Sequence, residues 1–367
     1  MKKLLLLLAL SGCVAAGHAQ EILLGTDFKM YFDNKEFGSN EFAVPGLDIE
    51  SGTDFAARLT PRVGIRWDEK NTLVIAADMI KNFGTQESAY LSEIKPVFYY
   101  QFPTPKVPAA AGIFTRDMMH DDDYSTAFFS ESERFFHNRM NGVLAQYNGK
   151  RNSYVEFVCD WEGMYSTLSR EKFRILLAGR HYLDTFYYGF NYSMFHYAGQ
   201  QGAPIENVVD LQLLNPCVGV RFNAFFDFDI KLGALLTAQR DRRFGHSWEK
   251  PCMGEFAFRI SRWGLSLDER LYVGDNLHTI FYGHELADGT PLPSGRELYP
   301  AESFFRTDQK VYSRTALSYR RSFFNDTVSV RAEFAAHHDG TALGTQQMLV
   351  VGVKLLKTVY NSKNHKK

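Results

Sequence analysis

The sequence predicts an all-β protein, a transmembrane antiparallel up-and-down β-barrel of about 16 strands with both termini on the periplasmic side. Three observations predict it: recurrent alternation of apolar and polar residues, a regular alternation of short and long connections, and an aromatic content of 15% in 367 residues. A strand points successive side chains to opposite faces, so alternation with period two is typical of strands. No segment of any length repeats with the period of a helix.

The first element is an export signal. The chain begins MKKLLLLLALSGCVAAGHAQ, which has the two lysines, the apolar run and the small-residue exit of a secretory signal peptide. Cleavage after Ala19 would make residues 1–19 the signal peptide. The stretch LSGC also fits a lipobox, which would place a lipid on Cys13. By either route the protein leaves the cytoplasm.

The strands follow in residues 20–360, and 361–367 form a polar C-terminal tail. Every second connection is tight, whereas the others are long, and outer-membrane barrels have short periplasmic turns and longer outward loops. A soluble sandwich also has alternating strands but does not account for this rule. The predicted strands are 23–34, 55–67, 72–83, 92–103, 107–118, 142–149, 153–163, 172–183, 186–198, 215–227, 229–241, 251–263, 264–274, 309–324, 326–337 and 345–360.

The two faces of each strand predict what it meets. In FAARLTPRVGIRW (55–67), one face is apolar from end to end and the other carries three arginines. The apolar face belongs to lipid and the polar face to a wet interior. Pro61 lies on the lipid face and donates no ladder hydrogen bond, so we expect a local bulge there. Glu269 and Arg321 also fall on the lipid face and should lie near an interface.

Charged residues that face the interior are predominantly basic. Barrel closure places the first strand beside the last, so one wall should be rich in arginine: Arg58, Arg62, Arg66, Arg314, Arg320 and Arg331. Acidic residues concentrate in the third long connection (119–141) and on the seventh strand, on the opposite side. These third-loop or pore-lining acids are Asp121, Asp122, Asp123, Glu131, Glu133, Glu156 and Asp160.

Sixteen strands, alternating turns and loops, an arginine row and a long acidic third loop resemble the general trimeric outer-membrane porins of bacteria. The resemblance implies that the third loop folds inward, so that its acids face the arginines across a constriction, and that the protein forms a homotrimer. Facing rows of opposite charge would set up a transverse field across a narrow passage.

The expected function is therefore passive diffusion of small polar solutes and ions through a channel in the outer membrane of a Gram-negative bacterium. The expected partners are outer-membrane lipid and those solutes. Neither a cofactor nor a metal is expected, nor an enzymatic activity. The net charge of −1 does not suggest nucleic acid as a partner.

Other interpretations stay open. The arginines could satisfy nearby carboxylates in a lumen too full to conduct. The long connection 275–308 could cap a substrate-specific transport or binding barrel. A barrel enzyme is a third possibility, and His120 with the following aspartates could bind a divalent cation, although a solvated acidic run is commoner. Candidate enzyme residues are His120 with Asp121–Asp123, His284–Glu285, and His337–His338–Asp339. Cys159, Cys217 and Cys252 are expected to be isolated thiols, with a Cys217–Cys252 bridge as the alternative.

Overall fold

The computed structural model describes residues 21–37, 51–85, 89–202, 208–242, 247–280, 295–306 and 309–361. The predicted signal peptide, Cys13 and all but the first residue of the predicted tail lie outside these ranges. None of the helices within them is long and apolar enough to cross a bilayer.

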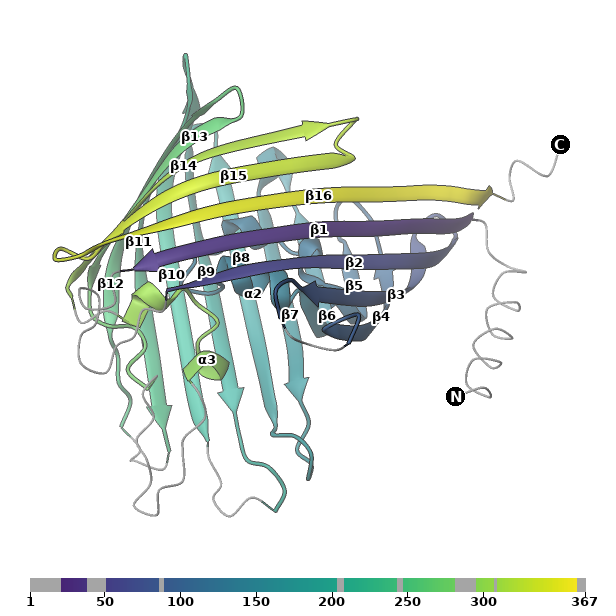
Figure 1. The fold of residues 1–367 in the computed structure, drawn as a ribbon, viewed down its shortest axis with the longest axis horizontal. Helices are drawn as coiled ribbons and strands as arrows, with labels where there is room; N and C mark the ends of the chain where they lie inside the picture. Colours follow the sequence, from purple (N-terminus) through teal and green to yellow (C-terminus); the bar gives the residue numbers. More distant parts are fainter. Residues whose placement is uncertain are drawn as a thin grey trace.

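The described residues form sixteen antiparallel strands that close into one barrel, in which each strand pairs with its neighbours in sequence and β1 pairs with β16. Glu21 lies opposite Asn361, so β1 begins and β16 ends at the same end of the barrel (Figure 1). We call this the termini end and the opposite end the mouth. The strands are β1(Glu21–Phe37), β2(Gly52–Trp67), β3(Asn71–Asn82), β4(Glu93–Phe102), β5(Ala109–Thr115), β6(Arg139–Asn148), β7(Tyr154–Gly163), β8(Lys172–Leu183), β9(Phe186–Tyr197), β10(Val209–Asn223), β11(Asp227–Asp241), β12(Cys252–Arg262), β13(Leu265–Gly274), β14(Val311–Phe323), β15(Val328–His338) and β16(Leu343–Asn361).

Helical turns lie in the connections between strands. In the described ranges the α-helices are α2(Glu131–Phe136) and α3(Gly295–Leu298), and the 3₁₀ turns are η1(Arg116–Met118), η2(Asp121–Asp123), η3(Lys150–Asn152) and η4(Ser303–Arg306). Helix α2 begins after Ser130, whose hydroxyl oxygen accepts a hydrogen bond from the Glu133 backbone N–H at 3.0 Å. Such a cap satisfies a donor that has no partner within the helix.

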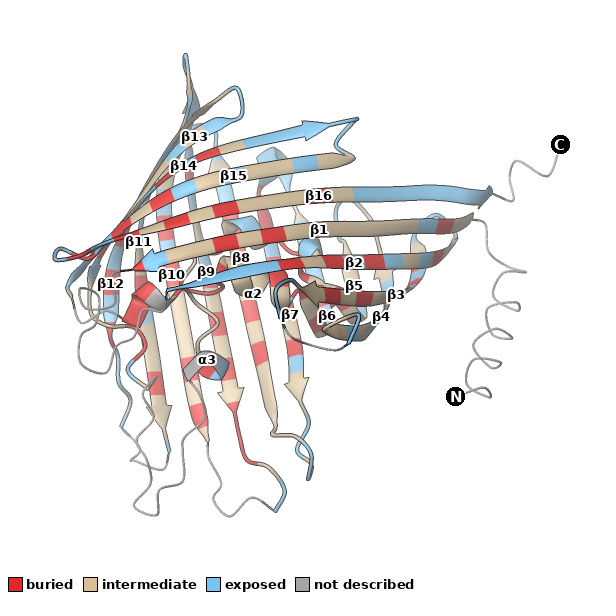
Figure 2. Cartoon of the chain, in the orientation of Figure 1, coloured by how far each residue is buried: buried red, intermediate tan, exposed pale blue. Residues whose placement is uncertain are grey.

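The predicted faces are confirmed by the exposure of the side chains. On β2, Leu59 and Val63 are exposed outside the barrel, whereas Arg58, next to Leu59, is buried inside. Exposed large apolar residues occur on most strands, and buried residues recur as separate bands along them (Figure 2). The exposed residues on the outer wall near the termini end include Trp263 and Phe324, where an interfacial aromatic girdle belongs.

Two details of the prediction are wrong. The β2–β3 ladder skips Thr60 and Pro61 but resumes in the same register, so the proline interrupts the ladder without a bulge. Strand β10 begins at Val209, six residues before its predicted start. In its first half the usual alternation is reversed, because inward-facing Leu211 and Leu213 pack against other residues in the lumen while Asp210 and Gln212 lie on the other face. The following turn accordingly lies at 224–226 instead of around Phe228.

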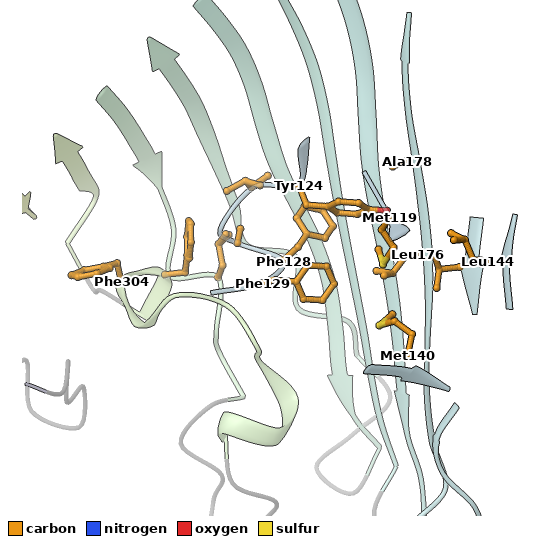
Figure 3. Packing of buried hydrophobic residues seen from close by; sticks show 14 of the residues in the cluster. Met119, Tyr124, Phe128, Phe129, Met140, Leu144, Leu176, Ala178 and Phe304 are labelled. Carbon is orange, nitrogen blue, oxygen red and sulfur yellow. The ribbon is translucent and has the colours of Figure 1, made fainter. Parts of the chain in front are cut away.

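The hydrophobic core lies inside the barrel. The connection between β5 and β6 folds inward, and its Met119, Tyr124, Phe128 and Phe129 pack against lumen-facing residues such as Leu176 (Figure 3). Phe304 of the connection between β13 and β14 joins the same cluster. We call 116–138 the first inward segment and the described parts of 275–306 the second. The two are hydrogen-bonded to each other, from Ser130 N to Pro300 O at 2.8 Å and from Glu302 N to Thr126 O at 3.1 Å.

Candidate functional site

The predicted arginine wall lies inside the barrel, but its charges are paired. Each arginine of the β2 row meets a carboxylate of a neighbouring strand, and Arg58 also donates to the Phe135 carbonyl oxygen of the first inward segment. These pairs leave little unpaired positive charge along β2. Such pairing agrees with the alternative interpretation, in which the arginines satisfy nearby carboxylates in a filled lumen. The pairs are Arg58–Asp78 (2.6 Å), Arg62–Asp27 (3.1 Å) and Arg66–Glu21 (3.0 Å).

The rest of the wall is bound to the first inward segment at one point. Arg331 donates to both carboxylate oxygens of Glu131, at 3.2 and 3.3 Å. Arg314 and Arg331 also share Glu333, whereas Arg320 is exposed near the termini end. Burial raises the pKa of the Glu131 carboxyl, but Arg331 and Arg134 outweigh that effect and hold the pKa at about 2. Glu131 is therefore ionised at neutral pH and latches the segment to the wall.

The other predicted acids do not face the arginine row. Within the segment, Asp121 pairs with Arg134 at 3.0 Å and Glu133 with His137 at 2.5 Å. Asp123 pairs with Arg180 on β8 at 2.7 Å, and Asp122 is exposed. Glu156 accepts from the backbone N–H of His120 and from the Tyr124 hydroxyl, and Asp160 accepts from the Asn141 backbone N–H. Glu156 thus anchors the inward segment to the opposite wall.

A polar cavity of about 410 Å³ opens where the two inward segments meet the mouth ends of β1 and β2. We call it the mouth cavity. Lys35 contributes its ammonium group and is held between Asp33 at 3.7 Å and Glu302 at 3.5 Å. The cavity is lined by Lys35, Ser51, Gly52, Thr53, Asp54, Ser130, Ser132, Glu133, His137, His278, Tyr299, Pro300, Ala301, Glu302 and Arg306.

A histidine–carboxylate pair lies at this cavity. The Nδ1 atom of His137 is 2.5 Å from a Glu133 oxygen, and the imidazole side chain is 66% exposed. Burial raises the pKa of the Glu133 carboxyl, but its hydrogen bond to His137 and the nearby positive charges lower it overall. An ionised carboxylate that holds Nδ1–H leaves Nε2 as a proton acceptor, which is the arrangement of a general base.

An apolar slot adjoins the mouth cavity, with about 50 Å³ of free volume. Its lining includes Phe128, Phe195, Leu211 and Leu298, and four residues of the second inward segment line both spaces: His278, Tyr299, Pro300 and Ala301. His278 is 5% exposed and stacks on Tyr299 at 4.2 Å. Among the described residues, its Nδ1 has no hydrogen-bond partner. Burial, and then Arg306, lower the pKa of His278 to about 3, so the imidazole is neutral at this junction.

The enzyme residues suggested by the sequence occupy other places. His120 stacks on Tyr154 at 3.8 Å. His337 is hydrogen-bonded at both ring nitrogens, to Tyr312 at 2.9 Å and Gln346 at 3.1 Å, so it is structural. His284 and Glu285 lie outside the described residues. The three described cysteines are free thiols, without a Cys217–Cys252 bridge. Sequence reasoning did not identify Lys35, His137 or His278.

An antiparallel barrel that is closed, apolar outside and polar at many inward positions is an outer-membrane β-barrel, because closure leaves no sheet edge in lipid. This confirms the predicted fold, its architectural resemblance to porins and the predicted location in the Gram-negative outer membrane.

Residues 14–284 match the model of the family described as Lipid A 3'-O-deacylase-type. The chain belongs to that family. The expectation of a protein without enzymatic activity is therefore wrong, because the family is one of enzymes. That expectation rested on the absence of a spaced catalytic motif from the sequence.

Among solved structures, the chain is similar to three bacterial proteins in fold alone. OccK1 of Pseudomonas aeruginosa has 9% identity and a TM-score of 0.48, covering 93% of this chain and 100% of that one. OprD of the same organism has 11% and 0.46, covering 93% and 95%. OccAB3 of Acinetobacter baumannii has 9% and 0.46, covering 92% and 99%. At these values the likeness carries no argument about function. No curated protein sequence matches the chain.

Proposed function

We propose that this protein is an outer-membrane hydrolase that removes an ester-linked acyl chain from a glycolipid of the lipid A class. The observation that carries the proposal is the His137–Glu133 pair at a polar cavity that adjoins an apolar slot. An acylated sugar needs both environments, a polar one for its head and an apolar one for its chain. Membership of the Lipid A 3'-O-deacylase-type family supports the same reaction class.

The cavity contains groups for each step of ester hydrolysis. His137, oriented by Glu133, takes a proton from water at Nε2 while the water oxygen attacks the ester carbonyl. The positive charge of Lys35 favours the oxyanion that develops on the carbonyl oxygen. The bond between the acyl carbon and the sugar oxygen then breaks, and the imidazolium returns its proton to that oxygen. The products are a free fatty acid and a sugar hydroxyl.

The test is release of fatty acid from purified lipid A by the folded barrel in detergent, followed by mass spectrometry. We expect loss of one acyl chain per molecule, and a rate at least about 100-fold lower for His137→Asn and Glu133→Gln. His338→Asn is the matched control, because this exposed mouth-end histidine lies outside the cavity lining. Absence of acyl release by the natural protein, or full activity of both variants, would contradict the proposal.

A substrate-specific channel is the second candidate, and the finer form of the predicted porin function belongs here. The polar cavities on both sides of the inward segments favour it, whereas the paired arginines and the apolar cluster in the lumen speak against free diffusion. A steady open level of water-filled size in a planar bilayer would support diffusion. Silence with saturable solute uptake would support a specific channel. Migration of an unheated sample would test the proposed homotrimer.

A further inference from the structure

A second cavity, of about 260 Å³, lies in the half of the lumen nearer the termini end, and we call it the lower cavity. Inward residues of β8 to β13 form its walls, and the tip of the first inward segment, from Asp122 to Ser125, covers it. Its volume is below the range of about 300–1,000 Å³ typical of drug-sized ligands, so it fits a small metabolite.

Most charges around the lower cavity cancel in pairs. Three of its cations contact a carboxylate that also lines the cavity, and Lys231 contacts Glu255 just beyond it. A fifth acid, Glu269, has the outward parity of β13, and it accepts hydrogen bonds from the hydroxyls of Ser313 and Thr315, which have the outward parity of β14. The pairs are Arg180–Asp123 (2.7 Å), Arg221–Asp229 (2.5 Å), Arg259–Asp268 (2.6 Å) and Lys231–Glu255 (3.0 Å).

Two opposite charges of the lining are left over. Within the part of the chain that the structure describes, Arg270 has no carboxylate at ion-pair distance, and its register neighbour on β14 is another cation, Arg314. Asp122 likewise makes no ion pair with a described residue and is exposed to the cavity from the inward segment. Arg270 and Asp122 come from different elements and line the same space. Charged groups inside a barrel are stabilised by a partner of opposite charge.

We infer that the lower cavity binds a small zwitterionic solute, whose carboxylate pairs with Arg270 and whose ammonium group pairs with Asp122. A simple anion would satisfy Arg270 but leave Asp122 without a partner, and a simple cation would do the reverse. A solute with both groups, such as a free amino acid, satisfies the two residual charges at once. This site lies apart from the mouth cavity and goes beyond the proposed hydrolase, so either can fail alone.

The test is calorimetric titration of the full barrel in detergent with L-alanine, acetate and methylammonium. We expect L-alanine to bind at least tenfold more tightly than either single-charge probe. Arg270→Met should weaken L-alanine binding by about 10- to 100-fold, the usual effect of a charged hydrogen bond. Arg270→Lys should restore part of it. Arg151→Gln is the matched control, since this arginine lies in an exposed turn outside the cavity lining, and it should leave binding within about twofold.

Asp122→Asn provides a second test that does not touch the barrel wall. It should weaken L-alanine binding at least tenfold while acetate binding is unchanged or tighter. Equal affinities of acetate and L-alanine for the natural protein would contradict a zwitterion site and would indicate a simple anion site. Absence of binding by all three probes to a barrel with normal heat-modifiable migration would overturn it. Deacylation by Arg270→Met should stay at the natural rate in every case.

Discussion

Glu131→Gln removes the carboxylate that binds the first inward segment to the arginine wall. In the folded protein the pKa of Glu131 falls from 4.5 to about 2, and at 1.36 kcal/mol per pKa unit this corresponds to about 3 kcal/mol of favourable interaction. Arg331 is 21% exposed and Glu131 19%, so solvent screening reduces the figure. We expect a loss of about 2 kcal/mol in the free energy that holds the segment against the wall.

Hydrogen exchange of the backbone amides measures this loss directly. If the free energy of local opening falls by about 2 kcal/mol, exchange within the segment should be about 30-fold faster, while exchange in the strands is unchanged. Asp184→Asn is the control, because its pair with Arg151 lies in an exposed turn at the other end of the barrel. Unchanged exchange in the segment of a correctly folded Glu131→Gln barrel would refute the latch.

The remaining predictions concern buried groups. Arg58→Met should cost about 3 kcal/mol in urea unfolding, because it leaves a buried carboxylate without its main partner, and Arg58→Met with Asp78→Leu should recover most of it; no recovery would refute the pair. Gly219→Ala should destabilise the barrel by about 1–3 kcal/mol in the same assay, since the added Cβ would collide with the Tyr187 ring, and natural stability would refute the contact. The pKa of His278 is lowered on folding from 6.5 to about 3, so the docking free energy of its segment is fully present above pH 6.5 and falls by about 1.4 kcal/mol per pH unit below that. Because intrinsic amide exchange slows as the pH falls, the quantity to compare is the protection factor, which should fall in that segment at pH 5 relative to pH 7. His278→Leu should remove the difference, and an equal fall in the variant would contradict this assignment.

The barrel was predictable because both faces of each strand meet a uniform medium. Lipid outside and polar groups inside impose period two on the sequence, so even the inward direction of Arg58 could be read from its neighbours. The partner of Arg58 could not be predicted in this way. Asp78 is 20 residues away on the next strand, and only the exact register brings the two side chains to 2.6 Å.

The segments that fill the lumen carry a recognisable signal in the sequence. Paired phenylalanines occur at 128–129, 135–136 and 304–305, all in long connections. Apolar pairs in such connections indicate a segment that packs inward, and all three pairs do so. The role of His278 had no comparable signal, because its surroundings come from strands and connections distant in sequence.

The pairing of β1 with β16 has a consequence for assembly. These strands are the longest, and their ladder runs from Glu21 opposite Asn361 to Phe37 opposite Gly344. The first strand to leave the secretion machinery must therefore wait, with one side unpaired, until the last has arrived. Its alternate charged residues, such as Lys29, discourage wrong partners during that wait. Strand β16 completes the wall, so a protein shortened within it would be an open sheet with an unpaired edge on β1.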